Sequence, residues 1–195
     1  MIIKIANSWA DWLVTNGADN DDHDVYVYGA EFILNEFISD FVLILTSLML
    51  HKVFEVFVWM LFFTPLRINL GGTHASSHFK CIFSSTVLCY ICIYTAPLVV
   101  NYPIIIAVIS AISLLTVFKI APVVHPNHPV SETRRLKSRR IAKVIVCLEV
   151  SISAIAYIFF SKRLGCLVSV TTFSVCVLGI FGKLHSFEKP VNIQV

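Results

Sequence analysis

Charged residues are scarce in this chain of 195 residues: Asp, Glu, Lys and Arg together make up only 14% of it. Soluble domains carry about 25% charged residues and about 45–50% apolar ones. Here 57% of the residues are hydrophobic, and the mean hydropathy is +0.81. The shortage of charge therefore excludes a soluble globular protein and indicates one that lies in a bilayer.

Long polar stretches are also missing, so the sequence predicts a single integral membrane domain over residues 1–195. Four apolar runs, at 82–100, 102–118, 141–160 and 164–182, come close to the roughly 20 helical residues that cross a bilayer. The stretch 32–66 is harder to assign, because His51, Lys52 and Glu55 interrupt it. As one helix it would be about 52 Å long, which exceeds one membrane thickness.

Two interpretations of residues 32–66 remain open. The stretch forms either two membrane segments that turn near His51 and Lys52, or an in-plane helix to about Asp40 followed by one span over 41–63. The absence of Gly and Pro near residue 51 weakens the first interpretation. The fold class is therefore all-α and polytopic, with five or six membrane segments.

The N-terminal residues lack the basic region, compact apolar run and small-residue cleavage site of a secretory signal. Residues 2–14 instead alternate apolar and polar side chains at roughly helical spacing and include Trp9 and Trp12, which is typical of an amphipathic interfacial helix. We expect residues 1–30 to form an interfacial or cytoplasmic segment. Its acidic run, 19–24, lacks the glycine and distal glutamate of a calcium loop and is interpreted as a solvated linker.

Basic residues indicate how the chain is oriented. Short loops rich in Lys and Arg stay in the cytoplasm, so we expect residues 119–140 to form a basic cytoplasmic loop. Because the runs 102–118 and 82–100 cross the membrane twice, we expect residues 67–81 to lie on the same, cytoplasmic side as this loop. The loop could also touch anionic lipid or dock an acidic peptide. Its cations are Lys119, Arg134, Arg135, Lys137, Arg139 and Arg140.

Residues 67–81 combine a paired glycine, two histidines and a cysteine between apolar stretches. A cysteine beside a histidine can form a thiolate nucleophile. On one straight helix His74 and Cys81 would lie about 10.5 Å apart, too far for the roughly 3 Å contact of a general base. His74 would need a non-helical segment that folds back, which Gly71 and Gly72 permit. By spacing alone His78, three residues before Cys81, is the nearer base.

Two other classes of function compete with a thiol enzyme. A metal-dependent intramembrane oxygenase or hydroxylase would use clustered histidines, although the glutamate of a His-Glu-x-x-His zinc site is absent. A non-enzymatic peptide exporter would show internal repeats or broken helices, and neither is visible. Of the three classes only the thiol enzyme needs Cys81. The histidines in question are His74, His78, His125 and His128.

Glu149 lies in the middle of the apolar run 141–160. An ionisable residue at that depth is expensive unless it faces a cavity or a partner, so it is a candidate functional residue. The cysteines other than Cys81 lie within apolar runs, where cysteine acts as a small hydrophobe.

Several short motifs occur in a characteristic order along the chain. Residues 28–29 read YG, 66–67 read LR, 71–75 read GGTHA with Cys81 following, 121–123 read APV and 128–130 read HPV. In these motifs, and in its length and segment order, the chain resembles the accessory gene regulator protein B (AgrB) family. Members of that family are membrane peptidases of quorum-sensing systems. The resemblance covers nearly the whole chain.

The resemblance implies a cysteine endopeptidase that removes the C-terminal tail of an AgrD-type precursor peptide, with His74 as base and Cys81 as nucleophile. A cysteine or serine of the precursor would then attack the acyl-enzyme thioester and close the thiolactone or lactone ring of an autoinducing peptide. His78 falls in a variable stretch of the family pattern and is expected to be an exposed loop residue. Candidate supporting or substrate-binding residues are Arg67, Gly72, Glu149, Arg134 and Arg135.

No cofactor, metal ligand or nucleic acid is expected. The expected partners are the precursor peptide, the bilayer of a bacterial cell membrane, and a second copy of the chain in a dimer.

Overall fold

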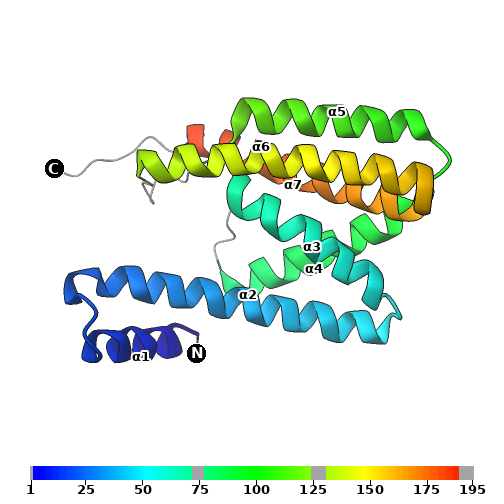
Figure 1. The fold of residues 1–195 in the computed structure, drawn as a ribbon. Helices are drawn as coiled ribbons and strands as arrows, with labels where there is room; N and C mark the ends of the chain where they lie inside the picture. Colours follow the sequence, from blue (N-terminus) through cyan, green and yellow to red (C-terminus); the bar gives the residue numbers. More distant parts are fainter. Residues whose placement is uncertain (1, 72–76, 124–130, 189–195) are drawn as a thin grey trace. The chain divides into compact units, whose positions relative to one another are not determined.

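The computed structural model describes residues 2–71, 77–123 and 131–188. These residues are almost entirely helical and contain no β-strand beyond one isolated bridge. Six of the helices are long and apolar enough to cross a membrane (Figure 1), which confirms an all-α polytopic fold. The α-helices are α1 (Ile2–Thr15), α2 (His23–Met49), α3 (Val53–Leu70), α4 (His78–Thr95), α5 (Pro103–Ile120), α6 (Glu132–Ile155) and α7 (Lys162–Glu188), with short helical turns η1 (Asn20–Asp22), η2 (Ala96–Leu98) and η3 (Ala156–Phe160).

The stretch 32–66 consists of two helices that are separated between Met49 and Val53. Of the two interpretations, the one with two segments is confirmed, and the continuous span over 41–63 is wrong. The break uses His51, whose φ of 54° lies in the left-handed region that glycine usually occupies. Lys52 Nζ then donates to Glu55 Oε1 at 2.9 Å, so the charges that interrupt the run neutralise each other at the start of α3.

The chain forms two compact units. The N-terminal unit contains residues 1–51 and 76–86, and the C-terminal unit contains residues 52–75 and 87–195; α4 therefore contributes its first turns to one unit and the rest to the other. In the N-terminal unit, α1 runs antiparallel along the start of α2 (Figure 1). Ala6 and Ala10 are completely buried, whereas Trp12 is 59% exposed, so α1 packs through small residues and turns large apolar ones outward.

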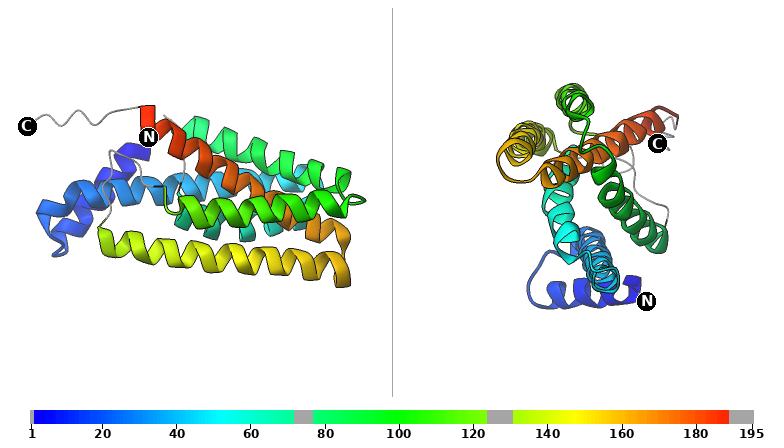
Figure 2. Two further views of the ribbon diagram at one scale, coloured as in Figure 1. Left: turned by 90° about the horizontal axis from the view of Figure 1, so that it is seen from above. Right: turned by 90° about the vertical axis from the view of Figure 1, so that its right-hand side faces the viewer.

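The C-terminal unit is built around α7, which packs against α3, α5 and α6 (Figure 2). Apolar side chains from all four helices form its core, together with Ala121 just beyond α5: Leu66, Leu70, Val117, Ala121, Ala142, Val146, Val175 and Cys176. Hydroxyl groups add polar contacts beside this core. Ser169 Oγ is 2.7 Å from Ser153 Oγ and 3.0 Å from Ser110 Oγ, which links α7 to both α6 and α5. Such contacts between small residues are typical of helix packing in membranes.

The last part of the predicted basic loop over 119–140 is helical in the residues that the structure describes. Its cations from Arg134 onward lie in the first turns of α6, which begins at Glu132. Ser131 caps this helix, because its Oγ accepts a hydrogen bond from Arg134 N at 3.4 Å. A serine cap followed by glutamate is a helix start signal, and it extends α6 well before the apolar run.

Candidate functional site

Cys81 lies in the first turn of α4, within the N-terminal unit. Its backbone N donates to Ser77 O at 3.0 Å, and its carbonyl accepts from Ser84 Oγ at 3.0 Å. The side chain is half-buried and the thiol is free. A regular helix therefore fixes the backbone of the proposed nucleophile while part of the side chain stays accessible.

His78 differs from its prediction as an exposed loop residue. It is the first residue of α4 and is half-buried, because its Nδ1 is 3.2 Å from Asn35 Oδ1 on α2. An amide oxygen can only accept, so in this contact the ring nitrogen Nδ1 is the donor. His78 and Cys81 are three residues apart and share one face of the helix.

A second polar contact continues this attachment of α4 to α2. Ser39 Oγ and Ser85 Oγ are 3.0 Å apart. Asn35 and Ser39 are four residues apart on α2 and therefore share a face. Two polar contacts thus hold the turns around Cys81 in place. Sequence reasoning missed both α2 residues, whose only signal was two polar side chains at helical spacing within an apolar run.

In the C-terminal unit, Arg67 shapes the end of α3. Its Nη1 donates to the carbonyl of Gly71, which ends the helix. Gly71 forms a parallel bridge with Val123, and Val123 N donates to Leu70 O at 2.7 Å. A Cβ atom on Gly71 would lie 2.2 Å from Val123 O, so only glycine fits there. We call this arrangement of Arg67, Leu70, Gly71 and Val123 the Gly71 junction.

The Gly71 junction joins two of the segments that carry the sequence motifs. The GGTHA motif starts at Gly71, and the APV motif ends at Val123. The expected base His74 and the candidate Gly72 lie outside the described residues, as do His125 and His128 of the metal hypothesis. Among the residues that the structure describes, no three metal-ligating side chains gather.

Glu149 is buried between α6 and α7, with 3% of its surface exposed. Thr172 Oγ1 donates to Glu149 Oε2 at 2.8 Å and also approaches Val168 O at 3.0 Å. The carboxyl group therefore faces a partner in the helix packing. Arg134 and Arg135, by contrast, are exposed on the first turns of α6, and neither forms an ion pair within the described part of the chain.

Comparison with known proteins identifies the family. The family model for Accessory gene regulator B (AgrB) matches residues 6–187, nearly the whole chain. A search of curated proteins found no match, and a search of solved structures found none. The family match includes Cys81 and the Gly71 junction, and it agrees with the six membrane-length helices. The chain is a multi-pass membrane protein that belongs to the AgrB family of quorum-sensing accessory gene regulator proteins, a membership that implies association with an AgrD-type peptide.

Proposed function

We propose that this protein is a membrane cysteine endopeptidase that cuts the C-terminal tail from an AgrD-type precursor and promotes cyclisation of the remainder. Cys81 is the nucleophile, and His74 is its base. The observation that carries the proposal is the setting of Cys81. It lies half-buried in the first turn of α4, which the Asn35–His78 and Ser39–Ser85 contacts hold against α2.

The reaction has two acyl-transfer steps. The base removes the thiol proton, and the sulfur attacks the carbonyl of the scissile peptide bond. The C–N bond breaks, the departing amine of the tail takes the proton, and the rest of the precursor stays bound as a thioester. A cysteine or serine side chain of the precursor then attacks that thioester, closes the ring and releases the thiol. Exclusion of water near the membrane surface favours ring closure over hydrolysis.

Other residues support this chemistry. Arg67 stabilises the C-terminal end of α3, because it binds the carbonyl of Gly71. The catalytic segment 67–81 continues from this helix end. Gly72 provides the backbone freedom for the bend before His74. Glu149 has a supporting role in holding α6 against α7 through Thr172.

The cations of α6 suggest orientation and substrate contact. Arg134 and Arg135 are exposed and suit acidic groups of the precursor. Lys and Arg concentrate in the N-terminal turns of α6. We therefore place this end of α6, together with segment 67–81, on the cytoplasmic side. A dimer remains the proposed assembly.

The test is cleavage of the cognate precursor by purified protein in lipid, with the products analysed by mass spectrometry. We expect Cys81→Ala and His74→Ala to abolish cleavage. His78→Ala should retain cleavage, lowered less than tenfold by loss of the Asn35 contact, and the wild type yields a cyclic product. Cys147→Ala is the matched control, because Cys147 is an exposed free cysteine on α6. Cleavage that survives Cys81→Ala would refute the thiol mechanism and redirect attention to metal chemistry or export.

A further inference from the structure

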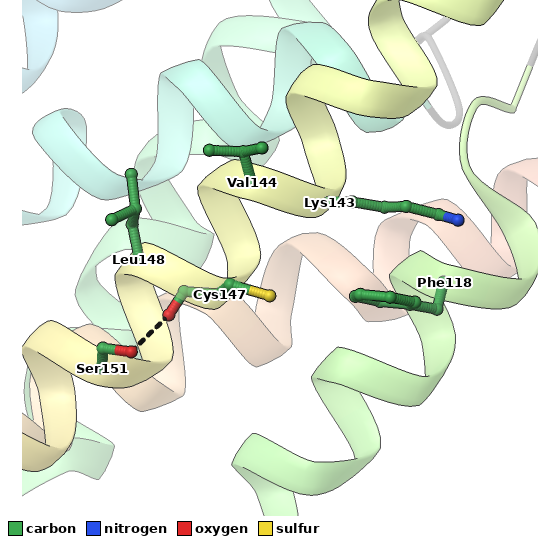
Figure 3. A pocket seen from close by; sticks show the side chains of 6 residues that line it. All are labelled: Phe118, Lys143, Val144, Cys147, Leu148 and Ser151. Carbon is green, nitrogen blue, oxygen red and sulfur yellow. Dashed lines mark hydrogen bonds between the residues drawn. The ribbon is translucent and has the colours of Figure 1, made fainter.

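An open groove of about 340 Å³ lies between α5 and α6 on the surface of the C-terminal unit (Figure 3). It is lined by Phe118, Lys143, Val144, Cys147, Leu148 and Ser151. The large apolar side chains of this lining are well exposed: Phe118 is 45%, Val144 59% and Leu148 56% accessible. Because both helices are membrane-length, the exposed apolar lining suits contact with lipid acyl chains.

Charge in the groove is confined to one end. Ser151 Oγ donates to Cys147 O at 2.8 Å, so its hydrogen is used within α6. Lys143 Nζ lies 4.8 Å above the Phe118 ring, a cation–π contact that holds the ammonium at the mouth of the groove (Figure 3). The lining therefore offers one positive charge and otherwise mainly apolar surface.

Three more cations lie within one helical turn of Lys143 or next to Phe118 along the chain. Arg139 and Arg140 precede Lys143 by one helical turn, and Lys119 follows Phe118 in the last turn of α5. Within the described ranges, none of these four cations forms an ion pair. We call them the basic end of the groove. An anion that binds there would meet positive charge with no carboxylate already in place.

The dimensions of the groove match part of a lipid. Lys143 and Ser151 are eight residues apart, about 12 Å along the helix axis, which is most of the roughly 15 Å hydrocarbon depth of one leaflet. We propose that the groove binds an anionic phospholipid, whose acyl chain lies along Val144 and Leu148 and whose phosphate lies at the basic end. A peptide fits less well, because the apolar lining would leave its backbone N–H and C=O groups without partners.

The proposal is independent of the peptidase function and makes a quantitative statement about selectivity. A Lys or Arg near the surface of an anionic membrane contributes about 1 kcal/mol, equivalent to about fivefold in affinity. Removing the Lys143 charge should therefore weaken binding of phosphatidylglycerol about fivefold and leave phosphatidylcholine nearly unaffected.

The experiment measures lipid binding to the full-length protein in detergent by native mass spectrometry, with phosphatidylglycerol and phosphatidylcholine titrated separately. In parallel, bound lipid should slow the alkylation of Cys147 by a maleimide, which peptide mass spectrometry resolves from the other cysteines. Lys143→Gln is the test variant. Lys162→Gln is its matched control, because Lys162 Nζ also lies over an aromatic ring, that of Tyr157 at 6.0 Å, but does not line the groove.

We expect phosphatidylglycerol to bind more tightly than phosphatidylcholine and to protect Cys147, and both effects to fall in Lys143→Gln but not in Lys162→Gln. Leu148→Trp, which fills the groove, should weaken both lipids and serves if the first variant does not fold. Equal loss in the two lysine variants, or unchanged binding in Lys143→Gln, would overturn the proposal. Protection by soluble glycerol phosphate or by an acidic peptide alone would also overturn it in favour of a simple anion or peptide site.

Discussion

Substitution of Gly71 by alanine is the sharpest test of the Gly71 junction. The backbone at Gly71 has φ 79° and ψ −157°, a combination that is nearly restricted to glycine. The added methyl group would lie 2.2 Å from Val123 O and 3.2 Å from the Val123 carbonyl carbon. Both atoms belong to the backbone, so the methyl group can be accommodated only if the chain at Val123 moves away.

The expected loss of stability is the sum of two contributions, backbone strain at residue 71 and a broken hydrogen bond at Val123. Holding alanine in that backbone region costs about 1–3 kcal/mol. Moving Val123 breaks its 2.7 Å hydrogen bond to Leu70 O, which contributes about 1 kcal/mol. Gly71→Ala should therefore lower the free energy of unfolding by about 2–4 kcal/mol, or the melting temperature by about 4–16 °C for a chain of this size.

The assay is thermal unfolding in detergent followed by helical circular dichroism, with precursor cleavage measured on the same samples. Gly17→Ala is the matched control: Gly17 has φ 100°, but no atom lies within 4 Å of the position that an added Cβ would occupy. Gly17→Ala strains the backbone but displaces no neighbouring atom. It should lower the free energy of unfolding by only about 1–2 kcal/mol. If the two variants melt at the same temperature, the close approach of Gly71 to Val123 does not stabilise the protein.

Further predictions concern the buried carboxylate and the attachment of α4. Glu149→Gln should shift the thermal midpoint little, because the amide oxygen can still accept from Thr172. Thr172→Val should lower the free energy of unfolding by about 1–3 kcal/mol, because it leaves the buried carboxyl group without its donor; equal melting of the two variants would argue against this contact. Asn35→Ala should lower the turnover of precursor cleavage by less than tenfold with an unchanged KM, since Asn35 holds the helix of Cys81 through His78. Turnover equal to wild type would show that the contact does not position the thiol.

The membrane segments were predictable because hydropathy reports on them directly. Each of the four clear apolar runs matches a membrane-length helix to within two residues or lies inside one, and the split of residues 32–66 follows its interrupting charges. The rule that a break needs Gly or Pro failed at His51, which adopts a positive φ without being glycine. The start of α6 was misjudged for a different reason. Charge indicated a loop, although the local signals at Ser131 and Glu132 already favoured a helix.

The contacts around the candidate site were beyond sequence reasoning because they join distant positions. Asn35 and His78 are 43 residues apart, and their contact depends on how α4 lies against α2. The bend at Gly71 was expected from glycine's freedom, but its partner Val123 was not. A motif such as APV indicates that residues 121–123 have a specific role. Only the tertiary arrangement shows that Val123 limits the space at Gly71.

The central position of α7 in the C-terminal unit could not be predicted from hydropathy. The spans of α5 and α7 are both strongly apolar, yet α7 is far more buried. In lipid, apolar side chains gain little by moving from acyl chains to other helices, so packing depends on close approach and polar contacts. A Cβ on Gly165 would lie 2.6 Å from Ser153 O, and Ser153 Oγ donates to Gly165 O at 2.8 Å. The close contacts of small and hydroxyl-bearing residues, rather than hydropathy, therefore distinguish α7 as the helix around which the others pack.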